Sequence, residues 1–550
     1  MQASPDMAAT SPASPATATT SATQQDWLDT DDLLRWRQCP RRYWWQREAL
    51  AAGSAVAADA LSADDGSSHA LRPDDGPVGA AVGQALRASH PMGVEIVAPA
   101  GPHDAPGWAL AVRATAAALD AGVLDAEGGA IVGACLASDD GVRVRADLLA
   151  PGERGLRVLR LRHATAGNEA DVDAAALWAH VAARSGLRLQ GVALRLVDTD
   201  FVYPGHGLYA GLYRDSDLSP MLGSRPVPAW LVAMRQCARG GLPAATPGAH
   251  CGGAAPCPWR PRCDAAPPEP EATAPDALAV LGRDHAQRLR AAGFARLGEL
   301  SAAQAAAQLG EPRLQHIWQA VTQGAPVIAP ALGAQLRAMP WPRRWLRIDT
   351  LGYAVPVWAG TRPYQALPFQ WTLADESGPG TLLWHAYLAG AGAGTDPRRA
   401  WAESLLAAAA PVPFEAGPVF AYNAGYERNR LAELATLFDD LAPALLALQA
   451  RLVDLYPLMR AHVYHPEMRG AWSFRAVARA FVPELGGHRF GADSPLPPLA
   501  ASPAEAMARA LHPGTSAPVR EALRGALLAH GRRQVQVLMA LTRRFEQAAP

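Results

Sequence analysis

Cysteine is scarce in this sequence, with six residues in a chain of 550. A disulfide-stabilised scaffold needs a far higher density of cysteine, so that class of protein is excluded. The few cysteines that are present are unevenly placed, which makes their spacing informative.

A charge imbalance is also missing, because 50 basic and 51 acidic residues leave a net charge of −1. Global electrostatics therefore does not steer the chain toward nucleic acid, and any basic surface must be local. Lysine is absent, so all 50 basic residues are arginine, and asparagine occurs only three times. Together with abundant alanine, glycine and proline, this indicates a codon bias. An arginine where another protein has lysine therefore carries little functional weight.

The chain has no run of 18 apolar residues, so we expect no membrane span and no membrane partner. Residues 1–24 are rich in Ala, Ser, Thr and Pro and predict a disordered tail. They lack the basic start and apolar core of a signal peptide. The expected location is the cytoplasm, where thiols stay reduced.

Three of the cysteines, Cys251, Cys257 and Cys263, lie close together in a Gly- and Pro-rich loop. Such a loop cannot hold thiols in register by backbone hydrogen bonding, so we expect a thiolate-bound metal or cluster to tie it down. A fourth ligand is needed, and Cys39 is the best candidate. Thiolates suit both an iron–sulfur cluster, such as [4Fe–4S], and zinc, so the residues alone allow either cofactor.

The other explanation for these thiols is that they pack as small hydrophobic groups. That explanation suits the two remaining cysteines better. Cys135 lies in an apolar run, and Cys237 lies on a helix-like stretch.

The order of strand and helix patterns along the chain predicts an α/β protein with mixed sheets, and 49% hydrophobic residues give ample core. A chain of this length holds two to four domains. We expect an α/β domain over 25–263, a Pro-rich acidic linker over 264–275, a helical connector over 276–339 and a second α/β domain over 340–547.

Local patterns predict several elements of the first domain. Two short helices are expected within 25–50, separated at a Cys-Pro pair because proline disrupts a helix. Residues 141–150 alternate polar and apolar side chains and predict one continuous strand, and residues 157–165 predict the next. A helix near 171–185 and a strand near 189–197 complete this unit.

The last domain begins with a predicted strand, WLRIDTL, over 345–351. Residues 352–374 form a Pro- and Gly-rich segment. A strand over 417–423 runs into a helix at 424–438, and a long helix near 518–546 ends the domain.

Four stretches of the C-terminal half are distinctive: GTRPYQALPFQW, VFAYNAGYERNRL, LVDLYPLMRAHVYHPEMRGAWSF and VPEL. In order and spacing they resemble a bacterial family known as domain of unknown function 2779. In the N-terminal half, DLLRWRQCPRRYWW and the late cysteine triplet resemble the four-Cys iron–sulfur staple of RecB-type nucleases. The resemblance implies a PD-(D/E)xK nuclease-like N-terminal domain and a ribonuclease-H-like, DnaQ-type exonuclease fold in the C-terminal domain.

The RecB-type pattern implies an Asp on one strand and Glu-x-Lys on the next. Asp147 fits the Asp, but Arg160 and Arg162 stand where the Glu and the Lys are expected. Arg143 and Arg145 add further positive charge. One carboxylate among these guanidinium groups will not hold Mg²⁺, whereas the arginines suit a phosphate. The other explanation is that they pair with neighbouring acids or solvent.

The exonuclease pattern implies Asp-x-Glu on the first strand, an acid after an Asn-containing turn and a final Asp on the last helix. Arg347 replaces the first acid and Asp349 stands for the second; in a rival register Asp349 is the first and the second is missing. Glu427 follows the turn, and Gln534 stands at the last position. Hard divalent cations need clustered carboxylates, so Mg²⁺ or Mn²⁺ is expected only if activity survives. Asp454 is either a third ligand or an N-cap.

These replacements predict a catalytically degenerate, nuclease-like protein that binds DNA or RNA without efficient cleavage. Asp147, Asp349 and Glu427 are its vestigial acids, and the four strand arginines are its expected nucleic-acid contacts. One alternative is an active 3′–5′ exonuclease that uses Asp349 and Glu427 in a rearranged site. Another is a structural or interaction protein without nucleic-acid affinity.

Overall fold

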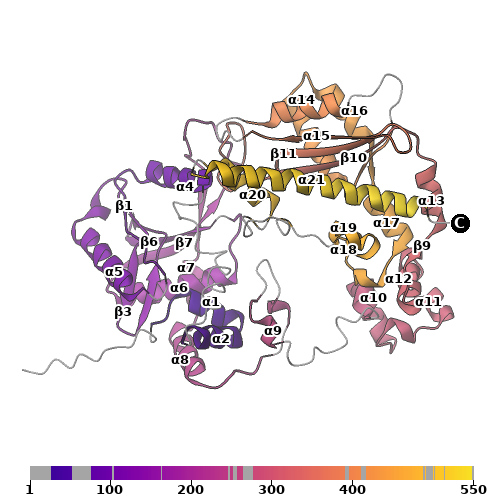
Figure 1. Ribbon diagram of the computed structural model, residues 1–550. Coiled ribbons are helices and arrows are strands. Elements are labelled where there is room, and N and C mark those ends of the chain that lie inside the picture. Colours follow the sequence, from indigo (N-terminus) through magenta and orange to yellow (C-terminus); the bar gives the residue numbers. More distant parts are fainter. Residues whose placement is uncertain are drawn as a thin grey trace, which may run out of the picture.

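The structure is a computed structural model. It describes residues 27–51, 76–101, 104–162, 164–245, 248–251, 257–263, 277–390, 396–409, 417–486, 490, 500, 502–512 and 514–547. The predicted tail over 1–24 and the predicted linker over 264–275 lie outside these residues. The fold is mixed α/β, as predicted, with one large sheet in each half of the chain (Figure 1).

The N-terminal lobe, which we define as the described residues of 27–263, is built on a six-stranded mixed sheet. In spatial order its strands are β1 (Val94–Glu95), β2 (Ile131–Val132), β5 (Leu148–Gly152), β6 (Gly155–Arg162), β7 (Leu189–Val197) and β8 (Tyr213–Asp217). The neighbouring strands β6 and β7 are parallel. Helix α6 (Glu169–Arg184) connects these two strands and begins with a capping box between Asn168 and Asp171.

The remaining helices of this lobe are α1 (Thr30–Gln38), α2 (Pro40–Ala51), α4 (Gly76–Ser89), α5 (Ala105–Asp120), η1 (Val123–Asp125), α7 (Ser219–Leu222), α8 (Val227–Arg239), η2 (Ala249–Cys251) and α9 (Arg260–Cys263). The predicted pair of short helices is confirmed. The Asp29 carboxylate caps α1 by accepting the Asp32 N–H at 2.9 Å, and the break falls just before Pro40.

The prediction of one continuous strand over 141–150 is wrong. Val142–Arg145 forms β4, which pairs with β3 (Cys135–Ser138) in a hairpin separate from the main sheet, and the chain then joins the main sheet as β5. The first three residues of β5 are all buried, so both faces of that strand are covered. The alternating pattern therefore ends at Asp147, and a period-2 pattern does not reveal a change of partner strand.

The C-terminal lobe, the described residues of 277–547, contains a five-stranded sheet. In spatial order its strands are β12 (Leu382–Leu388), β11 (Leu367–Glu376), β10 (Arg343–Leu351), β13 (Val419–Ala421) and β14 (Leu452–Asp454). The first three are antiparallel neighbours, whereas β13 and β14 run parallel to β10. The carboxyl ends of β10, β13 and β14 therefore meet at one edge of the sheet, where ligands bind in many open α/β sheets.

Helices surround this sheet: α14 (Arg398–Ala409), α15 (Gly425–Leu437), α16 (Ala442–Ala450), α17 (Leu455–His462), η5 (Pro466–Met468), α18 (Phe474–Phe481), α19 (Pro483–Gly486), α20 (Pro503–Leu511) and α21 (Ala517–Glu546). The long helix α21 crosses the sheet over β10 and β11 (Figure 1). Its closest approach is at Gly531, where an added Cβ would lie 2.3 Å from Gln370 Nε2 and 2.4 Å from Thr372 Oγ1. A glycine at this point lets the helix pack directly on the sheet.

Strand β11 was missed in the sequence, because residues 352–374 read as an irregular Pro- and Gly-rich segment. Nine of its ten residues are buried, including Gln370 and Thr372, so it shows no alternation of polar and apolar side chains. A central strand covered on both faces gives no period-2 signal.

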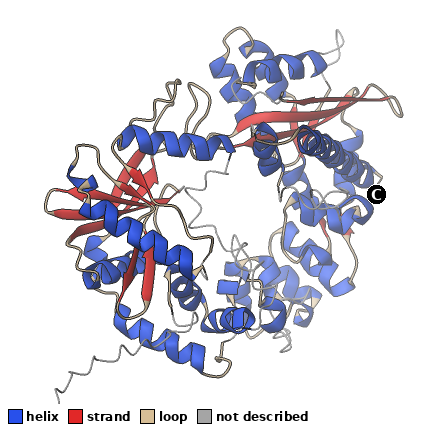
Figure 2. Cartoon of the chain, turned by 60° about the vertical axis from the view of Figure 1, so that its left-hand side comes forward, coloured by secondary structure: helices blue, strands red, loops and turns tan. Residues whose placement is uncertain are grey.

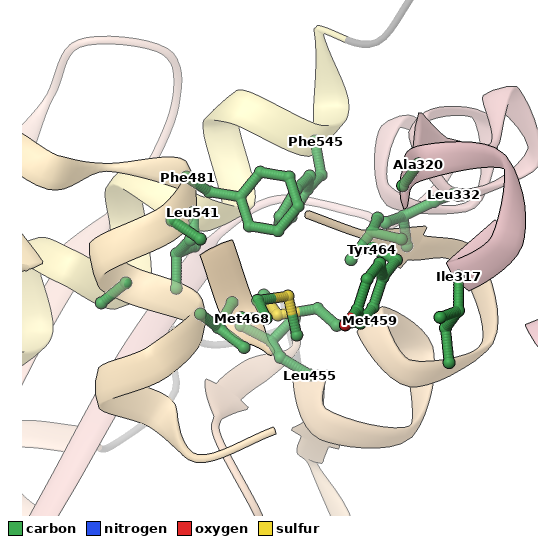
Figure 3. Packing of buried hydrophobic residues seen from close by; sticks show 14 of the residues in the cluster. Ile317, Ala320, Leu332, Leu455, Met459, Tyr464, Met468, Phe481, Leu541 and Phe545 are labelled. Atoms are coloured by element: carbon green, nitrogen blue, oxygen red, sulfur yellow. The ribbon is translucent and has the colours of Figure 1, made fainter. Parts of the chain in front are cut away.

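The predicted helical connector is η3 (Leu278–Leu281), α10 (Arg283–Ala291), η4 (Leu297–Glu299), α11 (Ala302–Gln308), α12 (Pro312–Gln323), β9 (Val327–Ile328) and α13 (Pro330–Arg337). It shares one hydrophobic core with the C-terminal sheet and helices. Figure 3 shows Ile317 and Ala320 of α12 in the same cluster as Tyr464, which follows α17, and Phe545 of α21. Strand β9 also pairs with β15 (Val463–Tyr464). The connector is thus packed into the C-terminal lobe.

The two lobes touch through the loop that follows β10. Its backbone forms two hydrogen bonds with Tyr203 of the N-terminal lobe, from Tyr203 N to Thr361 O at 3.0 Å and from Gly360 N to Tyr203 O at 2.8 Å. Figure 2 shows each sheet in its own lobe with helices packed around it. No helix in the described part of the chain has the length and apolar character needed to cross a bilayer.

Candidate functional site

A cavity of about 960 Å³ opens at the carboxyl-end edge of the C-terminal sheet. Its lining comes from the end of β10, the turn after β13, the first turns of α15 and α17, the N-termini of α18 and α20, and His530 of α21. The lining residues are Arg347, Ile348, Asp349, Thr350, Tyr422, Asn423, Tyr426, Tyr456, Trp472, Ser473, Phe474, Ser502, Pro503, Ala504 and His530. This volume is at the upper end of the range for small-molecule sites.

Two of the predicted acids meet beside this cavity. Asp349 lines it from β10 with an exposed fraction of 8%, and Glu427 lies fully buried in the first turn of α15. Arg347, which was predicted to replace an acid, lies with its Nη1 3.6 Å from Glu427 Oε1. A guanidinium group therefore lies within ion-pair distance of one of the two acids.

Glu427 is in an unusual state for a carboxylate. Burial raises its pKa to about 7, and Arg347 offsets only part of that effect. Within the described residues neither of its carboxylate oxygens accepts a hydrogen bond. Near neutral pH this group is therefore divided between its neutral and charged forms.

Asp349 has neither a hydrogen-bond partner nor an ion-pair partner for its carboxylate among the residues that the structure describes. It is thus a nearly buried acceptor that faces open space, which is the state of a side chain that contacts a ligand.

Asp454 serves as a structural cap. Its Oδ1 accepts the N–H groups of Tyr456 and Asn423, both at 2.9 Å, so it fixes the start of α17 and the turn after β13. Asn423 adopts a left-handed conformation with φ of 59°, which asparagine tolerates better than most residues. The N-cap alternative therefore describes Asp454.

The last helix contributes a residue that the sequence reasoning missed. His530 lines the cavity and interacts electrostatically with Asp349 and Arg347, whereas Gln534, the predicted replacement, is not part of the lining. Burial lowers the pKa of His530, so its neutral imidazole is favoured. The two residues are one helical turn apart and lie on the same side of α21.

Aromatic side chains form much of the remaining wall. Tyr422 packs edge-on against Tyr456 at 5.7 Å and tilted against Phe474 at 5.2 Å between ring centroids. The Tyr422 hydroxyl donates to Trp472 O at 2.7 Å. Tyr426 is 37% exposed at the rim. The cavity thus combines flat apolar surfaces with a few charged groups, as nucleotide-binding sites do.

The predicted N-terminal site has a different character. Asp147 Oδ2 accepts the Leu161 N–H at 2.7 Å, and burial raises the pKa of its carboxyl while Arg160 opposes that shift most strongly. Arg162 Nε lies 3.2 Å and Arg160 Nε 3.8 Å from Asp171 Oδ1. These arginines therefore lie among carboxylates of their own lobe.

The other two predicted arginines are divided between separate environments. Arg145 lies against Gly133, where an added Cβ would be 2.8 Å from Arg145 Nη2. Its charge also opposes the rise in the pKa of the Asp147 carboxyl. Arg143 is buried, with its Cζ 4.7 Å from the Trp108 ring centroid. Burial lowers its pKa, and the acids Asp29 and Asp32 at the start of α1 oppose that shift. The four arginines do not form one open basic surface.

The thiols are only partly brought together. Cys251, Cys257 and Cys263 interact electrostatically, and burial raises the pKa of Cys257. Burial raises the pKa of Cys237, and the neighbouring Cys39 raises it further. The sequence had assigned Cys237 to packing alone. The Cys loop does contact α2, through Trp259 Nε1 to Gln46 Oε1 at 3.3 Å. Residues 252–256 lie outside the described residues.

Among the residues that the structure describes, no group of three or more His, Cys, Asp or Glu side chains is arranged to hold a metal ion. This applies to the thiols and to both carboxylate sites. Cysteine thiolates suit a metal ion or a cluster, but the described cysteines are not arranged as a complete set of ligands.

Comparisons with known proteins give one match. No curated protein and no solved structure matches this chain. Residues 344–473, which include Arg347, Asp349 and Glu427 and supply most of the cavity wall, match the model of a family described as Domain of unknown function (DUF2779).

Proposed function

We propose that the C-terminal lobe binds nucleic acid at the 960 Å³ cavity and does not cleave it efficiently. The observation that carries this proposal is the ion pair between Arg347 and Glu427, 3.6 Å apart, at the edge where the exonuclease resemblance expects two acids to hold metal. A guanidinium group at this point repels divalent cations and attracts phosphate.

The fold supports the proposed exonuclease ancestry. A central strand flanked by two antiparallel strands on one side and two parallel strands on the other agrees with a ribonuclease-H-like sheet. Asp349 and Glu427 lie at the end of the central strand and at the start of the helix after β13. These positions meet at the edge where open α/β sheets bind ligands.

The alternative of an active one-metal enzyme has weaker support. It uses Asp349 and Glu427 as ligands, with Asp454 as an optional third. Glu427 is paired with Arg347, and Asp454 accepts two backbone N–H groups. Asp349 is the one strand-edge acid with no described partner. A single carboxylate is a poor site for Mg²⁺.

The test combines binding and cleavage. We expect the full chain to bind a labelled single-stranded oligonucleotide in fluorescence anisotropy, with affinity that falls as salt rises. We expect no cleavage of DNA or RNA with Mg²⁺ or Mn²⁺. The Arg347→Asp variant should lose oligonucleotide affinity and gain Mn²⁺ binding in calorimetry, because it returns an acid to the Asp349 edge. Arg399→Asp, an exposed residue of α14 outside the cavity lining, is the matched charge control.

Two outcomes contradict the proposal. Robust cleavage that is abolished by Asp349→Ala would establish the active enzyme. A lack of oligonucleotide binding even at low salt would favour the structural or interaction protein.

We also propose that Cys39, Cys251, Cys257 and Cys263 bind a [4Fe–4S] cluster, or zinc as the alternative. Binding would draw the loop against α2, where contacts already exist, because metal affinity and local folding are coupled. Metal analysis of an anaerobic preparation tests this. About four irons per chain indicate a cluster, one zinc indicates a zinc site, and neither metal contradicts the proposal.

A further inference from the structure

Two helices begin at the wall of the C-terminal cavity. Ser473 caps α18 by accepting the Ala476 N–H at 3.2 Å, and Ser502 caps α20 by accepting the Glu505 N–H at 3.2 Å. Both serines line the cavity, together with the first residues of each helix. The positive ends of two helix dipoles therefore face the same space.

Each of these helix ends retains unused donors. Within the described residues, the backbone N–H groups of Phe474, Arg475 and Ala504 have no hydrogen-bond partner. Helix α20 starts with Pro503, so its first available N–H is that of Ala504. Free N–H groups at the positive end of a dipole form a binding site for a phosphate or another anion.

A second and independent feature points to a ligand in the same cavity. Asp349 is more than nine-tenths buried, lines the cavity and has no described partner. A carboxylate does not attract a phosphate, so it must meet a donor group on another part of the ligand, such as a sugar hydroxyl. The aromatic wall around Tyr422 supplies surfaces for a base.

We propose that the N-termini of α18 and α20 hold the phosphate of a nucleoside monophosphate unit, with Asp349 accepting hydrogen bonds from its sugar hydroxyls. The unit is a free nucleotide or the terminal residue of a strand, and both have the same recognised chemistry. This inference rests on the proposed function and adds to it the location of the phosphate, at helix ends instead of at metal ions.

The experiment changes the charge of each cap and keeps its capping role. Asp and Asn cap helices about as well as Ser, so Ser473→Asp and Ser502→Asp add a negative charge, whereas Ser473→Asn and Ser502→Asn do not. Calorimetry measures the binding of adenosine monophosphate, adenosine and inorganic phosphate to the full chain. We expect each Asp variant to weaken adenosine monophosphate binding by about tenfold or more, and each Asn variant to stay within about threefold of wild type. Adenosine binding should be the same in all variants.

Ser301→Asp is the control for the charge itself, because Ser301 caps α11 in the connector, outside the cavity lining. It should leave all three affinities unchanged. Thermal unfolding of each variant checks that the caps survive, and a Ser502 variant that unfolds early is replaced by Ala504→Asp at the same end of α20.

Failure of this inference is distinguishable from failure of the proposed function. If the Asp and Asn variants bind adenosine monophosphate equally while the oligonucleotide still binds, the phosphate lies elsewhere and the inference is overturned. If inorganic phosphate binds with the expected sensitivity to the Asp variants but no oligonucleotide binds, the phosphate site stands and the nucleic-acid function is wrong.

Discussion

Asp147 in the N-terminal lobe and Asp349 in the C-terminal lobe both follow or end a strand, and both have arginine neighbours. Asp147 accepts a backbone N–H and lies among arginines, two of which also approach Asp171. Asp349 has no described partner and faces a cavity of about 960 Å³. The same type of residue is thus part of a closed charge network in one lobe and an open acceptor in the other.

The difference lies in where the compensating charge is placed. In the N-terminal lobe, Asp171 supplies a carboxylate next to Arg160 and Arg162. In the C-terminal lobe, Arg347 is paired with Glu427, which leaves Asp349 available. We therefore expect changes in the first network to affect stability and changes at the second site to affect binding.

The largest expected effect is that of Asp171→Ala. This change leaves Arg160 and Arg162 without their nearest carboxylate, and it removes the acceptor for the Asn168 N–H in the capping box of α6. Breaking a buried pair in this way should lower the free energy of unfolding by about 3 kcal/mol or more. Urea denaturation followed by circular dichroism measures it.

Glu169→Ala is the matched control, since Glu169 lies two residues away in the same first turn but is 81% exposed. It should change stability much less. Equal urea midpoints for the two variants would contradict the view of a closed network in the N-terminal lobe.

The second effect concerns the buried acid of the C-terminal lobe and depends on pH. Burial raises the pKa of Glu427 from 4.5 to about 7, so the folded protein gains stability from its protonation at low pH and loses it as pH rises through 7. Glu427→Gln removes this dependence. The difference between the two pKa values corresponds to up to about 3 kcal/mol, so the variant should gain that much relative to wild type between pH 5 and pH 8.

Urea midpoints at both pH values measure this shift. Glu433→Gln, on the same helix but 47% exposed, should show no such change with pH. If Glu427→Gln and wild type keep a constant difference in stability from pH 5 to pH 8, the carboxyl is not buried as described.

Sequence reasoning found the elements that carry a local signal. The helix α6, the strand β7 and the long final helix all agree with the structure, because hydrophobic periodicity is a local property. It missed β11, whose burial on both faces removes the alternation, and it joined β4 to β5 across a change of partner strand.

The sequence predicted the candidate site, like the fold, in part. The resemblance to the exonuclease pattern implied that Asp349, Glu427 and Arg347 lie close together, and the structure brings these three residues together. The pattern pointed to Gln534 on the last helix, whereas His530, one helical turn earlier, is the residue that lines the cavity. A residue count identifies the face of a helix, but the level along its axis depends on how α21 packs at Gly531, which is a tertiary contact.

The smallest expected effect is that of Asp349→Asn on stability. Asp349 has no described partner to lose, and an amide of the same shape is less costly to bury than a carboxylate, so the free energy of unfolding should change by less than about 0.5 kcal/mol. Asp147→Asn should cost more, because the Leu161 N–H loses a charged acceptor and the surrounding arginines lose their counter-charge. Urea denaturation of the two variants side by side makes the comparison direct. If Asp349→Asn is the more damaging of the two, then the open carboxylate has a structural partner, and the contrast between a closed and an open site is wrong.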